Sequence, residues 1–93
     1  MMLLTKANRA ALPPLYSSED TPAAEKMIHV KFFDPFSNWT WYAAEFDGQD
    51  LFFGFAAGTF PEWGYFSLAE LKSIGCIERD RHFTPAPFST NGQ

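Results

Sequence analysis

Aromatic and small apolar residues crowd the middle of the chain in two runs that a short polar break separates. The first run is WTWYAAEF at residues 39–46, and the second is LFFGFAA at Leu51–Ala57. Asp47 and Gly48 open the break and form a strong turn signal, because glycine adopts positive φ without steric cost and aspartate tolerates it. This pattern predicts a β-hairpin around which the rest of the chain is organised.

Alternation along the first predicted strand divides its side chains between two faces of a sheet. One face would carry Trp39, Trp41, Ala43 and Glu45, and the other Thr40, Tyr42, Ala44 and Phe46. Neither face is fully polar. One of them must therefore form the core, and the other is either covered by a helix or loop or left as an exposed aromatic patch.

Two more segments have the pattern of strands. Residues 27–33 alternate with a period of two, with Ile28 and Phe32 on the same face. Residues 76–83 alternate as well, and they carry so many charges that we expect an edge strand, where charge discourages pairing with other chains. Residues 58–64 (GTFPEWG) contain proline and two glycines, and they predict a loop.

The N-terminal part of the chain predicts a short helix followed by an irregular segment. Residues 4–12 would form the helix, with Thr5 as its N-cap. The helix ends before Pro13, because the residue that precedes a proline is pushed out of the α region. Residues 17–26 are polar, contain a proline and lack apolar periodicity, so we expect a mobile surface loop there.

The second predicted helix, Leu68–Ile74, has the clearest local signals. The Ser67 side chain can accept a hydrogen bond from the amide three residues on, and Glu70 is placed to reach back in a capping box. Gly75 suits the left-handed position that ends a helix. Residues 84–93 carry two prolines and small polar side chains, which predicts an extended or frayed tail.

These elements predict a single α+β domain that covers residues 1–93. The expected architecture is a four-stranded antiparallel sheet with two short helices packed on it, in the order α-β-β-β-α-β. A chain of 93 residues can bury one hydrophobic core, and its 17 aromatic residues supply much of the apolar area.

The charge distribution narrows the range of partners. The net charge is −4, and residues 32–71 contain six acidic residues but no lysine or arginine. This composition argues against binding of a nucleic-acid backbone, which requires basic residues to neutralise phosphates. It permits attraction to a basic partner, although an acidic surface that only keeps the protein in solution remains the alternative.

No arrangement of residues predicts catalysis, a cofactor or a metal. His29, His82 and Cys76 lack the spacing of metal ligands or of a nucleophile with its base, and no phosphate-binding loop follows the glycines. Three acids near the hairpin turn could hold a hard cation, but a solvated turn is the simpler interpretation. They are Glu45, Asp47 and Asp50.

Cys76 is the single cysteine of the chain, so no internal disulfide can form. This fits a monomer in a reducing cytoplasm, and the only disulfide-linked species open to the chain is a dimer through Cys76. No signal-peptide pattern is visible, and no apolar run approaches the roughly 20 residues of a membrane span. We therefore expect no membrane partner.

Aromatic side chains are the remaining candidates for binding. Trp39, Trp41 and Tyr42 on one strand could stack on bases or sugars. Core packing is the default role for most of them. Trp63 lies between proline and glycine, which favours partial exposure.

Several motifs together resemble those of the family known as domain of unknown function 2958. They are MLLTKANRAALPPLY at residues 2–16, VKFFDP at 30–35, SNWTWY at 37–42, EFDG at 45–48, GYFSLAEL at 64–71 and IERD at 77–80. The resemblance covers nearly the whole chain. It implies a small protein carried by plasmids, phages and other mobile elements, often beside anti-restriction and conjugation genes, and it brings no established catalytic residues.

Charge and resemblance together predict a non-catalytic interaction protein. We expect an inhibitor of a host defence system, anti-CRISPR or anti-restriction, that competes with DNA for a basic groove on a host protein complex. The candidate partner-binding residues are Asp34, Glu45, Asp47, Asp50, Glu62 and Trp63, with the acids expected in turns or at strand ends where they reach solvent. The alternative is a small-ligand or single-strand binding module that uses an aromatic sheet face.

Overall fold

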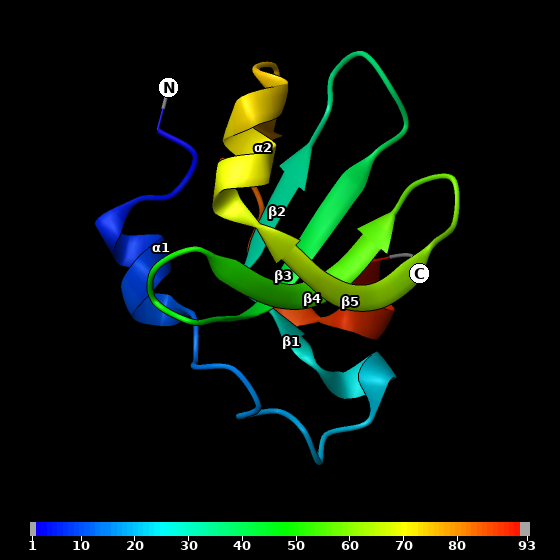
Figure 1. Cartoon of the computed structure of the whole chain (residues 1–93). Helices are drawn as coiled ribbons and strands as arrows, with labels where there is room; N and C mark the ends of the chain where they lie inside the picture. The colour runs from blue at the N-terminus through cyan, green and yellow to red at the C-terminus, as the bar shows by residue number, and fades with distance from the viewer. Residues whose placement is uncertain (1, 92–93) are drawn as a thin grey trace.

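A curved antiparallel sheet of five strands lies at the centre of the computed structural model, which describes residues 2–91. The strands run in the order β5-β4-β3-β2-β6 (Figure 1). Their bounds are β2 Val30–Phe33, β3 Thr40–Phe46, β4 Leu51–Ala57, β5 Glu62–Ser67 and β6 Glu78–Arg79. The α+β class is therefore as predicted, but the main sheet has five strands instead of four.

Shorter elements surround this sheet. They are α1 Lys6–Ala11, η1 Ala23–Glu25, β1 Met27–Ile28, α2 Leu68–Ile74, β7 Ala86–Pro87 and η2 Phe88–Asn91. Strands β1 and β7 pair with each other in a second, two-stranded sheet. The strand predicted over residues 27–33 is thus broken at His29, whose amide donates to the carbonyl of Ala43 at 2.9 Å.

Strand β5 corrects the predicted loop over residues 58–64. Trp63 lies opposite Phe55 of β4, and Gly64 lies opposite Gly54. Glycine and proline made this segment look like a loop, whereas pairing with the aromatic residues of β4 supplies the cross-strand contacts that hold a strand together. Strand β6 is a sheet edge, as its charges predicted, although it is only two residues long.

A β-bulge interrupts the pairing of β3 with β4 between Ala43 and Glu45. The extra residue, Ala44, shifts the alternation of the side chains that follow it. Phe46 therefore joins the core on the first face, and Glu45 lies opposite Phe53 on the other face. The predicted division of β3 into faces is correct before the bulge and wrong after it.

The first face of the sheet forms the larger core together with the N-terminal segment and α2. Phe52 stacks between Phe46 and Phe66, with ring centroids 4.5 Å and 5.2 Å apart. Leu68 and Leu71 of α2 are almost fully buried against this cluster. The predicted helix-to-sheet packing of α2 is therefore confirmed.

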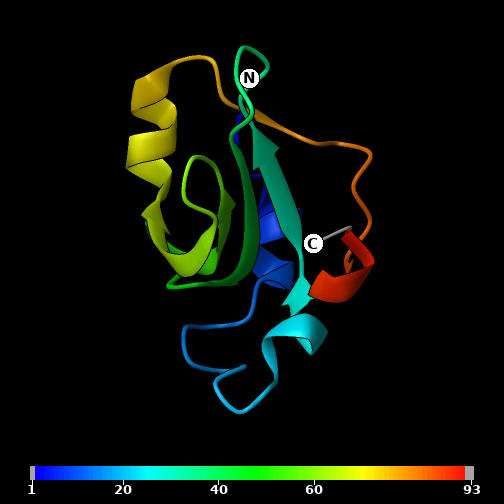
Figure 2. The same ribbon diagram turned by 90° about the vertical axis from the view of Figure 1, so that its right-hand side faces the viewer.

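The C-terminal segment covers part of the second face. Phe88 is 8 % exposed, and its ring centroid lies 4.8 Å from those of Phe55 and Trp63. Figure 2 shows α2 and η2 on opposite sides of β2. The prediction of an extended or frayed tail over residues 84–93 is wrong for residues 86–91, because one buried aromatic ring and the pairing of β7 hold them. Residues 92–93 lie outside the described part of the chain.

Local signals at the helix ends are largely confirmed. Thr5 caps α1, where its side chain accepts from the amide of Asn8 at 3.0 Å. The Ser67 side chain accepts from the amide of Glu70 at 3.2 Å, but the Glu70 side chain does not complete the predicted capping box. Gly75 ends α2 with a φ of 89°. These contacts are short-range in sequence, which is why sequence patterns predict them.

Candidate partner-binding site

Glu45 is buried, although the sequence predicted an exposed carboxylate. Its side chain is 3 % exposed and accepts hydrogen bonds from the amides of Tyr16 at 2.7 Å and Ser18 at 2.9 Å, and from the Ser18 hydroxyl. The bulge in β3 causes this placement by turning Glu45 towards the segment that follows α1. Its role is therefore to hold that segment on the sheet, and the prediction that its carboxylate reaches solvent is wrong.

Lys26 anchors the other end of the same segment. This side chain is only 9 % exposed, and its ammonium donates to the carbonyl of Ser18 while lying 5.8 Å from the ring centroid of Phe53. The hydroxyl oxygen of Ser18 lies 3.4 Å from the same ammonium, and this hydroxyl also donates to Glu45. Ser18 therefore bridges Lys26 and Glu45. Contacts at residues 16, 18 and 26 thus hold the predicted loop of residues 17–26 against the sheet.

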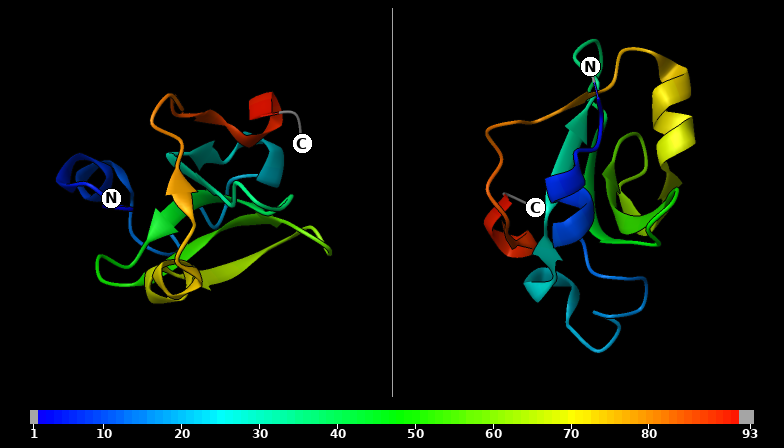
Figure 3. Two further views of the ribbon diagram at one scale, coloured as in Figure 1. Left: turned by 90° about the horizontal axis from the view of Figure 1, so that it is seen from above. Right: turned by 90° about the vertical axis from the view of Figure 1, so that its left-hand side faces the viewer.

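An open cavity of about 410 Å³ forms where this segment meets the second face of the sheet. We call it the tyrosine pocket. The segment runs past the end of the sheet opposite α2 (Figures 1 and 3). The residues that line the pocket are Tyr16, Glu19, Lys26, Glu45, Phe53, Trp63 and Tyr65. Two of the six predicted partner-binding residues, Glu45 and Trp63, therefore contribute to one cavity.

Aromatic rings from two paired strands make the wall of the tyrosine pocket. The Phe53 ring stacks on Trp63 at a centroid distance of 5.9 Å and meets Tyr65 edge-on at 5.2 Å. Tyr65 is 52 % exposed and Tyr16 is 63 % exposed. The wall thus continues from half-buried rings in the sheet to exposed rings at the mouth.

The backbone of Tyr16 has a left-handed conformation, with a φ of 72°. Such a conformation is uncommon for a bulky residue and costs free energy that other contacts must offset. The hydrogen bond from the Tyr16 amide to Glu45 is one such contact. It fixes the position of an exposed aromatic ring at the mouth of the pocket.

Negative charge dominates at the mouth of the pocket. The pKa of Tyr65 is raised, first by a hydrogen bond with the Tyr16 side chain, then by partial burial and by the negative charges of Glu45 and Glu19. The Tyr65 phenol therefore stays protonated at neutral pH and can act as a hydrogen-bond donor or acceptor.

Asp47 and Asp50 lie in the β3–β4 turn, away from the tyrosine pocket, and both have structural roles. One carboxylate oxygen of Asp47 accepts from the amides of Gln49, Asp50 and Leu51 at 2.8–3.0 Å. The Gln49 amide is the largest cause of the lowered pKa of Asp47. Asp50 accepts from the Ser67 hydroxyl at 2.7 Å and from the Ala69 amide at 2.8 Å, at the start of α2. Asp47 is exposed in a turn as predicted and Asp50 is half-buried, but both carboxylates are also engaged by the protein's own hydrogen-bond donors.

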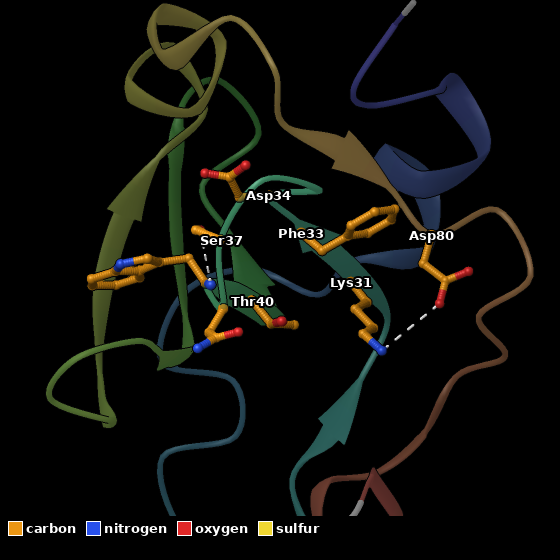
Figure 4. Close-up of a pocket in the computed structure, with 8 residues that line it drawn as sticks. Lys31, Phe33, Asp34, Ser37, Thr40 and Asp80 are labelled. Carbon is orange, nitrogen blue, oxygen red and sulfur yellow. Dashed lines mark hydrogen bonds and ion pairs between the residues drawn. The ribbon is translucent and has the colours of Figure 1, made fainter.

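Asp34 lines a separate polar hollow of about 520 Å³ beside the β2–β3 loop (Figure 4). Its carboxylate accepts from the Phe36 amide at 2.9 Å, and this bond is the main cause of its lowered pKa. Lys31 and Asp80 face each other in the hollow, with the ammonium 3.9 Å from a carboxylate oxygen. The charged side chains of this hollow are thus already engaged with one another or with the backbone.

Two of the three aromatic residues considered for stacking on bases or sugars pack in the core, which was their default role. Trp41 and Tyr42 are 7 % and 5 % exposed, and they lie in the cores of opposite faces. Trp39 is 36 % exposed, but its ring stacks on Trp41 at 5.6 Å and packs against Gly58. Of these three rings, therefore, only that of Trp39 is accessible to a base or a sugar.

The remaining predicted residues differ in accessibility. Glu62 is exposed at the start of β5, next to Trp63, which is half-buried among three neighbouring rings.

The sequence did not identify five residues that line the tyrosine pocket: Tyr16, Glu19, Lys26, Phe53 and Tyr65. Recognition of β5 would have placed Phe53 and Tyr65 together by strand pairing. No local sequence pattern points to Tyr16 or Lys26, because both are held through Glu45, directly or through Ser18, and Glu45 is distant from them in sequence.

Within residues 2–91, no three histidine, cysteine or acidic side chains gather in a cluster that could hold a metal ion. Cys76 is half-buried, and burial followed by the neighbouring Asp34 raises the pKa of its thiol. The pKa of His29 is lowered by burial. In the part of the chain that the structure describes, no helix is both long and apolar enough to cross a membrane.

The fold and the pocket define a small α+β domain with an aromatic cavity rimmed by acidic residues on one face of its sheet. Over residues 3–90 the chain matches the profile of DUF2958, a protein family of unknown function, and it belongs to that family. No curated protein and no solved structure matches the chain.

Proposed function

We propose that this chain is a non-catalytic interaction protein of mobile elements that binds a basic partner through the surface around the tyrosine pocket. In this proposal it acts in the host cytoplasm, and it inhibits a defence nuclease, of the CRISPR or restriction type, by occupying a surface that otherwise holds DNA. The observation that carries the proposal is the joint exposure of acidic and aromatic side chains at this pocket.

An exposed acid lies at the rim of the pocket, and two more are exposed on the same segment. Glu19 lines the cavity, and Asp20 and Glu25 are exposed between α1 and β1. Exposed charges of one sign attract an oppositely charged partner and speed its association. This surface replaces the hairpin turn as the expected contact, because Asp47 and Asp50 are engaged by the protein itself.

The exposed aromatic side chains at the same pocket favour a specific protein partner over an acidic surface that only keeps the protein in solution. Tyrosine and tryptophan are enriched at the centres of protein interfaces, where they supply contact area at low entropic cost. Tyr16 and Tyr65 project from the pocket mouth with more than half of their surface exposed. Acidic groups around aromatic anchors suit a partner surface that is rich in arginine and lysine.

A DNA-cleavage assay with purified host nucleases tests the proposal. Representative RNA-guided and restriction nucleases would be incubated with labelled target DNA and increasing amounts of the protein, at low and at physiological salt. We expect inhibition of at least one enzyme, which weakens as salt rises, because exposed charges are screened beyond about 8 Å at physiological ionic strength.

A matched pair of charge reversals locates the contact. Glu19→Lys should weaken inhibition strongly, whereas Glu70→Lys should not, because Glu70 is exposed on α2 at the opposite end of the molecule (Figure 1). Equal loss in both variants would mean that only net charge matters. Inhibition that neither variant nor salt changes would contradict the proposed mode of binding.

A further inference from the structure

The tyrosine pocket is lined by the faces of aromatic rings, and its volume suits one side chain of a partner. Its volume is about 410 Å³, within the range of cavities that hold small ligands. Phe53 and Trp63 form the inner wall, and Tyr16 and Tyr65 form the exposed mouth. Planar cations are attracted to such ring faces by the electrostatics of the aromatic system.

Of the two carboxylates that line the pocket, that of Glu19 has no basic residue of the lining to balance its charge. Lys26 and Glu45 are both buried, and Ser18 bridges them, so their opposite charges balance on the pocket floor. Glu19 is exposed at the rim, and no second basic residue lines the cavity. The pKa of Tyr65 is raised first by its hydrogen bond with the Tyr16 side chain and, to a smaller extent, by the negative charges of Glu45 and Glu19.

We infer that the tyrosine pocket receives an arginine side chain of the partner, whose guanidinium packs on the exposed tyrosine rings and faces the carboxylate of Glu19. This inference rests on the proposed function, and it names the chemical group that the basic partner inserts. Arginine suits the pocket better than lysine, because its guanidinium is planar and weakly hydrated and so stacks on aromatic rings at a lower desolvation cost than an ammonium.

A titration of the isolated protein with N-acetyl-arginine N-methylamide tests the inference without any partner. Chemical shifts of the Trp63 indole N–H and of the Tyr65 ring would be followed by NMR at low salt, with the Trp63→Phe variant assigning the indole signal. The lysine and citrulline counterparts serve as control probes, because citrulline has nearly the shape of arginine but no charge.

The expected result is a saturable shift of both pocket signals with the arginine probe. The citrulline and lysine probes should bind about two- to fivefold more weakly, the range of one exposed cation–aromatic contact. Equal affinity for citrulline and arginine would overturn the inference in favour of a neutral planar ligand. Equal affinity for lysine would overturn the choice of arginine, and shifts confined to other parts of the protein would overturn the choice of site.

Two variants and one control assign the contacts. Glu19→Gln should weaken the arginine probe about two- to fivefold, while Asp20→Asn, the neighbouring acid that does not line the pocket, should change its affinity by less than about twofold. Tyr16→Gly removes an aromatic ring at a position where glycine relieves the left-handed backbone, so the variant should fold and bind more weakly. A fully retained affinity in both pocket variants would contradict the inference.

The two proposals can fail separately. If the arginine probe binds as expected but no nuclease is inhibited, the pocket assignment stands and the proposed inhibition is wrong. If a nuclease is inhibited in a Glu19-dependent way but the arginine probe does not bind, the arginine assignment is wrong and the electrostatic mode of binding stands.

Discussion

The backbone amide of Tyr16 donates a hydrogen bond of 2.7 Å to the buried carboxylate of Glu45, across 29 positions of sequence. This contact connects the segment that follows α1 with the centre of the sheet. It also holds the left-handed backbone of Tyr16 and so sets the direction of an exposed ring. The candidate binding surface therefore depends on a carboxylate that is itself almost fully buried.

Glu45→Gln tests this dependence. The variant keeps the shape of the side chain but replaces one accepting oxygen by an amide group that cannot accept from Ser18 or Tyr16. We expect a loss of about 1.5–3 kcal/mol in the free energy of unfolding, as for hydrogen bonds to charged groups. Urea denaturation measures it, and exposed Glu62→Gln is the control, with a change within about 0.5 kcal/mol. Equal midpoints for the two variants would show that the buried carboxylate has no structural role.

Gly58 lies directly against the ring of Trp39, and this contact excludes a side chain at position 58. A Cβ atom there would approach three ring atoms of Trp39 to 2.4 Å. We expect Gly58→Ala to destabilise the fold by about 1–3 kcal/mol, as overpacking does. Gly64→Ala is the matched control, because nothing lies within 4 Å of its Cβ position, and its melting temperature should barely change.

A double-mutant cycle identifies the cause of that loss. In a Trp39→Ala background the clash is gone, so Gly58→Ala should then have almost no effect on stability. If the glycine substitution is equally damaging with and without the indole ring, backbone conformation rather than the Trp39 contact explains the glycine.

Asp50 and Ser67 act together at the start of α2. The Ser67 hydroxyl donates to Asp50 at 2.7 Å and accepts from the Glu70 amide at 3.2 Å. Ser67→Ala and Asp50→Ala should each cost about 1 kcal/mol of stability, the typical loss of an N-terminal cap. The double variant should cost less than the sum, because both single changes remove the same hydrogen bond. Thermal unfolding measures all three, and strictly additive losses would contradict the coupling.

Asp47 makes stability depend on acid pH. Its pKa is lowered in the folded state because backbone amides, first that of Gln49, stabilise the ionised carboxylate. The contribution is therefore fully present above the unfolded pKa of about 3.9 and is lost as pH falls through the lower folded pKa. Asp47→Asn should flatten the decline of the urea midpoint between about pH 5 and pH 2. Glu62→Gln is the control, and an unchanged pH profile in the Asp47→Asn variant would contradict the assignment.

The sequence predicted those parts of the fold whose signals are local. The hairpin turn at Gly48, the cap at Ser67 and the end of α2 at Gly75 all depend on residues within four positions of one another. The α+β class also followed from alternation and periodicity. These features can be predicted without knowing which distant segments of the chain contact one another.

The remaining features depend on contacts between distant segments. Strand β5 exists because its residues pair with β4, and the C-terminal segment is ordered because Phe88 packs on Tyr42 and Phe55. The six candidate site residues were chosen by charge and expected exposure. Backbone amides of the protein itself bind four of the five acids, which composition does not reveal.

The bulge at Ala44 has a consequence for how this family can vary. Removal of Ala44 would give β3 a single regular alternation in which Glu45 still lies opposite Phe53 and Phe46 still lies opposite Phe52. A relative that is one residue shorter at this point can therefore keep the buried carboxylate and the buried aromatic ring on their present faces. A relative of the same length that pairs these strands without a bulge would instead turn position 45 into the larger core and position 46 out of it, so the residue types at these two positions separate the two arrangements.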